Sequence, residues 1–150
     1  MTSRLCSLRL AAALALAAGF AGLAHADDSA ALAAAAKAPG ASVTSSGLVY
    51  QSLKDGTGAM PKATDTVKVN YKGTLVDGTK FDASADHGGP ITFPLNRVIP
   101  CWTEGVQKMK VGGKARLTCP SAIAYGPRGA GGVIPPNATL VFEVELVGIN

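Results

Sequence analysis

The stretch VIPCWTEGVQKMKVGGKARLTCPSAIAYGPRGAGGVIPPNATLV, from Val98 to Val141, contains the most informative arrangement of residues in the chain. A tryptophan lies on a short segment with helical spacing, and a Gly-Gly turn then leads into a strand. A tyrosine next opens a Gly/Pro-rich loop that ends at a strand of alternating apolar residues. This order predicts a small antiparallel domain whose sheet folds around one helix, with an aromatic-lined hollow between them. Such a hollow has few titratable groups and suits apolar or ring-shaped ligands better than acid–base or nucleophilic chemistry.

Alternation of apolar and polar residues predicts half-buried antiparallel strands on both sides of the tryptophan segment. The clearest alternations are residues 66–76 and 139–149. The other elements that we expect are strands at 48–54, 80–82, 91–95 and 114–119 and a helix at 102–109. The residues expected to be plain core are Val67, Val69, Phe93, Leu117, Leu140 and Val144. Strands outnumber helices and no βα repeat occurs, so the expected class is α+β.

The first 26 residues have the pattern of a secretory signal peptide. Arg4 and Arg9 precede an apolar run from Leu10 to Leu23, and Ala24-His25-Ala26 is a small-x-small cleavage pattern before Asp27. The alternative is an uncleaved membrane anchor. The run is shorter than the roughly 20 residues that cross a bilayer, so we expect cleavage and no membrane span afterwards. The expected location is therefore outside the cytoplasm, and the sequence leaves both the periplasm and secretion open.

Residues 27–46 are predicted to be a flexible linker, because they are rich in Ala and Ser and are interrupted by Pro39-Gly40. A helix over 30–37 would be too short to be stable alone. Residues 47–150 are long enough for one domain with one core.

Charge and residue spacing argue against several functions. The net formal charge is +4, and the basic residues are scattered along the chain, so no nucleic-acid surface is expected. We find no phosphate-binding loop, no Ser/His/Asp set and no metal-ligand spacing, so neither a metal nor a cofactor is expected. His87, in a polar loop, is predicted to be solvated and to have no role.

Two cysteines, Cys101 and Cys119, remain after the leader with its Cys6 is removed. In an oxidising compartment an even number of cysteines favours a disulfide, which here would close an 18-residue loop. The alternative is two buried free thiols.

Five blocks of this sequence resemble the FKBP-type peptidyl-prolyl cis-trans isomerases, most closely their bacterial exported members. The blocks are VNYKGTL (69–75), DGTKFDAS (77–84), VIPCWTEGVQKMKVGGKARL (98–117), AYGPRG (124–129) and VIPPNATLVFEVEL (133–146). Their order and spacing cover nearly all of residues 47–150. The resemblance implies a five- or six-stranded antiparallel sheet wrapped around one short helix.

The same resemblance implies a pocket that binds a proline ring. Trp102 would form its floor, the Ile99 amide and the Tyr125 hydroxyl would bond ligand carbonyls, and Asp82 would favour a twisted amide. The implied catalytic residues are Asp82, Tyr125, Trp102 and Phe81. The implied ligand-binding residues are Tyr71, Ile91, Val98, Ile99, Ile134 and Phe142.

The expected activity is therefore rotation about Xaa-Pro bonds during the folding of exported proteins, by a monomer acting on proline-containing polypeptides. The alternative is a binding module or chaperone that holds proline peptides or apolar ligands without turnover. Macrolides are further candidate ligands. Ile91, where many members of the family have an aromatic residue, and the Gly-Ala-Gly-Gly loop tip at 129–132 would both loosen the pocket rim.

Overall fold

A computed structural model describes the secondary structure of residues 23–150 and the side chains from residue 30 onward. The predicted signal peptide lies, up to residue 22, outside the described residues. The helices are α1 (Leu23–Ala36) and α2 (Pro100–Val106), with short 3-10 turns η1 (Ser84–His87), η2 (Leu95–Arg97), η3 (Ser121–Ile123) and η4 (Gly126–Arg128). The strands are β1 (Ala41–Val43), β2 (Val49–Lys54), β3 (Thr66–Leu75), β4 (Lys80–Ala83), β5 (Ile91–Pro94), β6 (Lys114–Cys119) and β7 (Leu140–Ile149).

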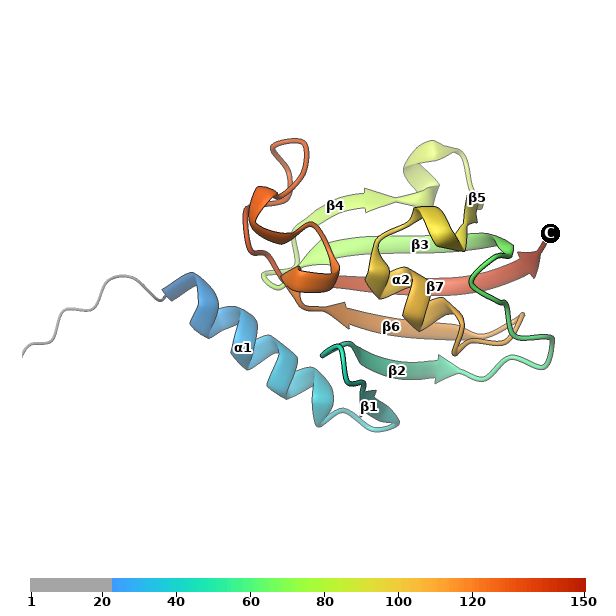
Figure 1. The fold of residues 1–150 in the computed structure, drawn as a ribbon, viewed down its shortest axis with the longest axis horizontal. Helices are drawn as coiled ribbons and strands as arrows, with labels where there is room; N and C mark the ends of the chain where they lie inside the picture. The colour runs from blue at the N-terminus through green and yellow to red at the C-terminus, as the bar shows by residue number, and fades with distance from the viewer. Residues whose placement is uncertain (1–22) are drawn as a thin grey trace, which may run out of the picture.

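The seven strands form one antiparallel sheet in the order β1-β2-β6-β7-β3-β4, with β5 also paired to β3 (Figure 1). The long strands β3 and β7 pair at the centre, with Tyr71 opposite Val144 and Gly73 opposite Phe142. Alternate residues of both strands are buried, as the sequence predicts for strands with one face on a core. The predicted α+β class, an antiparallel sheet around a short helix, is confirmed.

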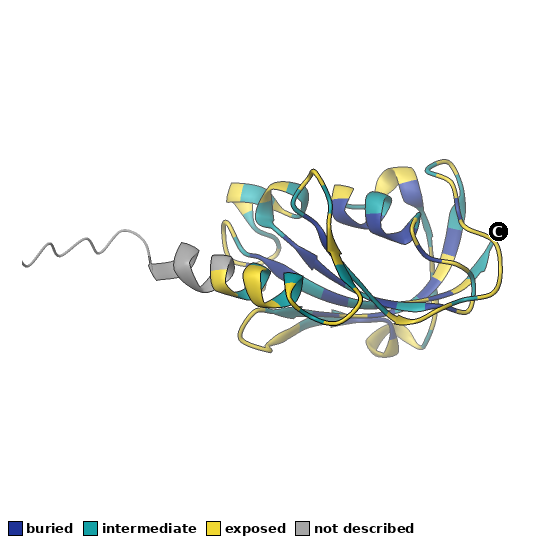
Figure 2. Ribbon diagram, turned by 90° about the horizontal axis from the view of Figure 1, so that it is seen from below, coloured by how far each residue is buried: buried dark blue, intermediate teal, exposed yellow. Residues whose placement is uncertain are grey.

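Helix α2 packs on the apolar face of this sheet, and the buried residues line the surfaces that the helix and sheet turn toward each other (Figure 2). Pro100 occupies the first turn, where its missing N–H leaves no hydrogen bond unmade. Gly105 permits close approach, since a Cβ there would lie 2.8 Å from Leu117 Cδ1. The helix is shorter than the predicted 102–109, although Met109 remains buried just beyond it.

The structure differs from the prediction in the segment expected to be a flexible linker. Helix α1 extends to Ala36, and β1 pairs with β2, with Ala41 opposite Gln51. Alanine has the highest helix propensity, and contacts between α1 and β1, β2 and β6 supply the packing that an isolated helix lacks. The sheet therefore begins at Ala41 instead of near Gly47. Helix α1 starts before the predicted cleavage site at Asp27, and that cleavage remains a prediction. Within residues 23–150, no helix is long and apolar enough to cross a membrane.

A disulfide joins Cys101, at the start of α2, to Cys119, at the end of β6, as predicted. The two Cα atoms are 5.9 Å apart, within the range that an unstrained bridge requires. Both residues are fully buried. The bridge therefore ties the only helix that packs inside the curve of the described sheet to a central strand.

We expect reduction of this disulfide to lower the free energy of unfolding by about 3 kcal/mol, because opening an 18-residue loop enlarges the conformational freedom of the unfolded chain. Urea unfolding with and without reductant measures the change. The double variant Cys101→Ala/Cys119→Ala is the control and should show no response to reductant. Equal stability of the wild-type protein in both conditions would contradict the prediction.

Candidate functional site

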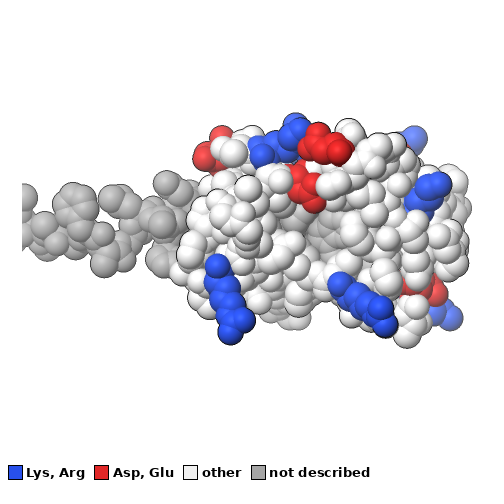
Figure 3. All heavy atoms as spheres, turned by 90° about the horizontal axis from the view of Figure 1, so that it is seen from above, with Lys and Arg blue, Asp and Glu red and all other residues white. Residues whose placement is uncertain are grey.

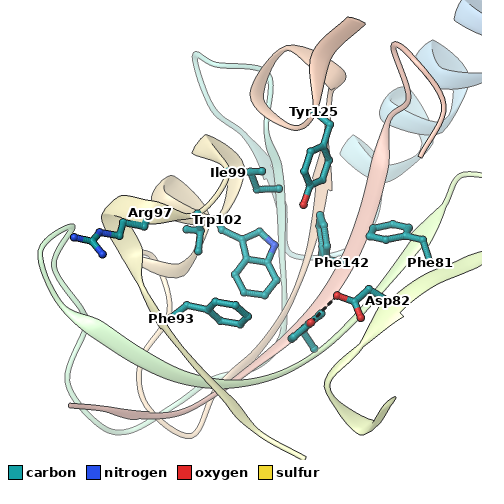
Figure 4. A pocket seen from close by; sticks show the side chains of 10 residues that line it. Phe81, Asp82, Phe93, Arg97, Ile99, Trp102, Tyr125 and Phe142 are labelled. Atoms are coloured by element: carbon teal, nitrogen blue, oxygen red, sulfur yellow. Dashed lines mark hydrogen bonds between the residues drawn. The ribbon is translucent and has the colours of Figure 1, made fainter. Parts of the chain in front are cut away.

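A cavity of about 440 Å³ opens between α2, the sheet and the loop that follows η3 (Figure 4). This volume lies in the range typical of small-ligand sites. Strands β3, β4, β5 and β7 contribute side chains to one wall, and η2, α2 and their junction contribute the other. The lining residues are Tyr71, Phe81, Asp82, Phe93, Arg97, Val98, Ile99, Trp102, Tyr125 and Phe142.

Trp102 forms the aromatic floor of the cavity and is only 4% exposed. Its ring centroid lies 5.2 Å from that of Tyr71, 5.5 Å from Phe93 and 5.4 Å from Phe142. All three contacts are edge-to-face, with interplanar angles of 78°, 86° and 85°. Edge-to-face contacts are the favoured geometry for aromatic pairs, so the indole is held in one orientation from three sides.

The floor offers almost no polar chemistry. The Trp102 Nε1 atom is buried and has no hydrogen-bond partner among the described residues. Phe81 extends the aromatic wall by an edge-to-face contact with Phe142, at 5.5 Å and 89°. A guest in this cavity is therefore held mainly by apolar contact.

Asp82 is the carboxylate that lines the cavity, and its oxygens are held by three donors. The Tyr71 hydroxyl donates to Oδ2 at 2.7 Å, and the Ala83 amide donates to Oδ1 at 2.9 Å. His87 Nε2 lies 2.8 Å from Oδ1. Burial, the largest influence, would raise the pKa of Asp82, but the hydrogen bonds from Tyr71, His87 and Ala83 together lower it below its usual value. The group is therefore a carboxylate at neutral pH and a poor proton donor.

The two tyrosines of the cavity stay protonated. Burial, followed by the hydrogen bond to Asp82, raises the pKa of Tyr71 well above its usual value. Burial and the Asp82 charge also raise the pKa of Tyr125. Tyr71 donates its proton to Asp82, whereas the Tyr125 hydroxyl has no hydrogen bond within residues 30–150 and points into the cavity (Figure 4). Tyr125 thus provides a free donor at the rim.

The loop that carries Tyr125 is closed by backbone hydrogen bonds. The Asn137 amide donates to the Gly126 carbonyl at 2.9 Å, and a bridge joins Ala130 to Ile134. Gly129 has φ +65°, and a Cβ there would collide with the Ile134 carbonyl. Glycine is therefore required at this point of the loop, and the closure positions the preceding tyrosine at the rim.

The structure brings eight of the ten predicted site residues together around the cavity and leaves two out. Ile134 is buried in the core, and Ile91, paired with Val69, packs against the core without lining the cavity. Neither residue is among those that line the cavity.

Three residues at or near the cavity were missed. Phe93, expected to be plain core, lies on the same face of β5 as Ile91, and its longer ring reaches Trp102. Arg97 lines the cavity from η2, with its guanidinium turned away from the other labelled residues (Figure 4). His87, expected to be solvated without a role, contacts Asp82. The strand alternation that places Ile91 could have identified Phe93, whereas no sequence signal identifies the His87 contact.

An apolar cavity with an aromatic floor and one hydrogen-bonded carboxylate suits a ring-shaped ligand that is held by contact. The sequence profile described as "FKBP-type peptidyl-prolyl cis-trans isomerase" matches residues 58–147. The chain belongs to this family.

Individual relatives agree with this assignment. The chain is 64% identical over 119 residues to the "FKBP-type peptidyl-prolyl cis-trans isomerase FkpA" of Aeromonas hydrophila. The aligned residues cover 79% of this chain and 44% of that protein. It is 47% identical over 112 residues to the "Outer membrane protein MIP" of Legionella longbeachae, covering 75% of this chain and 48% of that protein. The chain thus spans less than half the length of these two relatives.

Solved structures agree on the fold. The crystal structure of FkpA from Escherichia coli superposes with a TM-score of 0.81 at 49% identity, over 85% of this chain and 59% of that one. An isomerase structure from Pseudomonas syringae gives a TM-score of 0.77 at 39% identity, over 84% of this chain and 95% of that one.

We expect Gly73→Ala to disturb the cavity wall, because a Cβ there would lie 2.5 Å from Phe81 Cζ and 2.9 Å from Phe142 Cε1. The two rings must move, which should lower the free energy of unfolding by about 1–3 kcal/mol and shift the aromatic NMR signals of the cavity. Gly148→Ala on β7 is the matched control, since its Cβ meets nothing within 4 Å. Equal effects of the two substitutions would show that Gly73 is not required for the packing of this wall.

Proposed function

We propose that this chain is a prolyl isomerase that accelerates rotation about Xaa-Pro bonds in polypeptides outside the cytoplasm. The observation that carries the proposal is the Trp102-floored cavity with the ionised Asp82 carboxylate in its wall. Its floor offers a flat apolar surface of the kind that suits a proline ring. Membership of the isomerase family supports the same reaction and implies proline-containing polypeptides as substrates.

Isomerisation requires twisting of the C–N bond, whose loss of resonance sets a barrier of about 18–20 kcal/mol. A rate gain of about 10⁴ needs some 5–6 kcal/mol of stabilisation that acts on the twisted state only. A twisted amide has less charge separation than a planar one, so it loses less on entering an apolar cavity. The rigid grip of Trp102 and Phe81 on the ring, while the preceding bond rotates, favours the twisted geometry.

Polar groups at the rim would orient the peptide. The Ile99 amide, just before α2, makes no hydrogen bond within the described part of the chain and can donate to a ligand carbonyl. The Tyr125 hydroxyl can donate to a second carbonyl. Asp82 would act electrostatically on the carbonyl carbon or on the nitrogen as it becomes pyramidal, and the lowered pKa of its carboxyl supports that role over proton transfer.

The export proposed for this chain rests on the signal-like first 26 residues and on relatives that include a protein named for the outer membrane. We propose a monomer whose final location is the periplasm or the medium. The rival function is a binding module that holds proline peptides without turnover, and a catalytic assay separates the two.

We expect the protein to accelerate cis–trans exchange in a short proline peptide, and Asp82→Ala and Phe81→Ala each to lower kcat/KM at least about tenfold while the fold persists. Asp77→Ala is the control, since it removes an exposed carboxylate in the β3–β4 turn, away from the cavity. Circular dichroism checks the fold of each variant. Peptide binding without acceleration by the wild-type protein would refute catalysis and favour the binding module.

A macrolide ligand of the family should also occupy this cavity and change the fluorescence of Trp102, the only tryptophan of the chain. The change follows from replacing water above the indole with an apolar ligand. Trp102→Phe is the control and should lose the signal. An unchanged wild-type spectrum at saturating macrolide would argue against macrolide binding at this floor.

A further inference from the structure

The cavity has one positive and one negative side chain in its lining, and the two come from opposite walls. Of the ten lining residues, only Arg97 and Asp82 are charged. Asp82 belongs to β4, whereas Arg97 belongs to η2, just before α2. The Asp82 carboxylate contacts Tyr71, Ala83 and His87, and the proposed reaction uses it. That reaction leaves the positive charge of Arg97 without a role.

The backbone that carries Arg97 is anchored to the elements beside it. Leu95, the first residue of η2, is fully buried. Its amide donates to the Asp65 carbonyl at 3.0 Å, and its carbonyl accepts a hydrogen bond from the Thr103 hydroxyl of α2 at 2.6 Å. Arg97 therefore starts from a fixed point at the rim, two residues before the Ile99 amide that would bond a ligand carbonyl.

The Arg97 side chain is exposed and has no partner within residues 30–150. It makes no ion pair and no hydrogen bond with that part of the chain. The Asp65 carboxylate, which belongs to a residue whose backbone meets η2, accepts a hydrogen bond from the Lys62 amide at 2.8 Å. The guanidinium points away from the aromatic floor (Figure 4). It is therefore placed to meet a residue beside a bound proline, and not the proline ring itself.

We propose that Arg97 is a specificity-determining residue that favours substrates with an acidic side chain directly before or after the proline. The inference rests on the part of the proposed function that places a proline peptide in this cavity. Consecutive Cα atoms lie about 3.8 Å apart, so the neighbour of a bound proline lies at the rim. The planar guanidinium presents N–H donors that match the two oxygens of a carboxylate. A Glu or Asp side chain there pairs with Arg97, and a Lys side chain is repelled.

The size of the preference follows from the exposure of this pair. Solvent and salt screen a contact at the rim, so its contribution is small. We expect kcat/KM to be about two- to fivefold higher for a peptide with Glu beside the proline than for the same peptide with Gln. The pair forms with the planar and the twisted amide alike, so it lowers KM and leaves kcat unchanged. Salt at about 1 M should remove most of the preference.

NMR exchange spectroscopy on a set of short proline peptides tests this inference. Each peptide has Glu, Gln or Lys either directly before or directly after the proline, so the two sides are measured separately. The wild-type protein should prefer Glu over Gln on at least one side. Arg97→Gln keeps a polar side chain without the charge and should treat the Glu and Gln peptides alike. Arg97→Glu reverses the charge and should prefer Lys over Gln on that side.

Arg116→Gln is the matched control, because it makes the same exchange and the same change in net charge. Arg116 alternates along β6 with the buried residues Ala115 and Leu117, so its side chain lies on the face of the sheet away from the cavity. This variant should keep the wild-type preference for Glu. If it loses that preference as Arg97→Gln does, net charge and not contact with Arg97 selects the peptide, and the inference is overturned.

The other outcomes separate this inference from the proposed function. No acceleration of any peptide would overturn the proposed function, and tighter binding of the Glu peptide by the wild-type protein but not by Arg97→Gln would then still support selection by Arg97. Equal kcat/KM for Glu and Gln peptides on both sides, or a preference that Arg97→Gln retains, would overturn the role of Arg97 alone. A similar loss of kcat toward every peptide in Arg97→Gln would show that the residue acts through structure, and would also overturn it.

Discussion

The packing of Trp102 against the concave face of the sheet is the contact on which the site depends. Three rings from β3, β5 and β7 meet the indole edge-on, so strands far apart in the sequence are brought together at one side chain. Two features of α2 keep it close to the sheet. Gly105 allows close approach to β6, and the disulfide at Cys101 ties the first turn of the helix to the same strand. A rigid floor of this kind is prepared before any ligand arrives, so little ordering remains for binding to supply.

Few charged side chains lie around this apolar floor. The space-filling view shows acidic and basic side chains scattered over one face of the described residues, and other residue types form much of that face (Figure 3). Asp82 is the carboxylate that lines the cavity; Tyr71 and the Ala83 amide donate to it, and His87 Nε2 lies 2.8 Å from its Oδ1. A carboxylate held this firmly contributes an oriented electric field, and in the proposed reaction it would need no reorganisation as the amide twists.

The sequence predicted the fold best where apolar and polar residues alternate along a strand that has one buried face. The alternation in residues 66–76 and 139–149 predicted β3 and β7, because a one-residue slip would expose the whole core face. Family motifs placed Trp102, Asp82 and Tyr125 in one cavity, and the structure brings them together. Sequence-based prediction failed where the length of a side chain, or a contact with a distant part of the chain, decides which residues reach the cavity. Phe93 reaches the cavity and Ile91 does not, although both lie on one strand face.

The N-terminal segment and His87 show the same limit. Nothing in the Ala-rich composition of residues 27–46 indicates that residues 41–43 pair with β2, because that partner lies elsewhere in the chain. Likewise, a histidine in a polar loop looks solvated until the turn that carries it is placed beside Asp82.

The short outer strands of the sheet have a consequence for association with other polypeptide chains. At one side, β2 is covered by the three-residue β1, and at the other, β3 is covered by two separate four-residue strands, β4 and β5. Long unpaired borders are templates for adding foreign strands, and short interrupted ones resist this. The described sheet therefore offers other polypeptides little unpaired backbone on which to add strands.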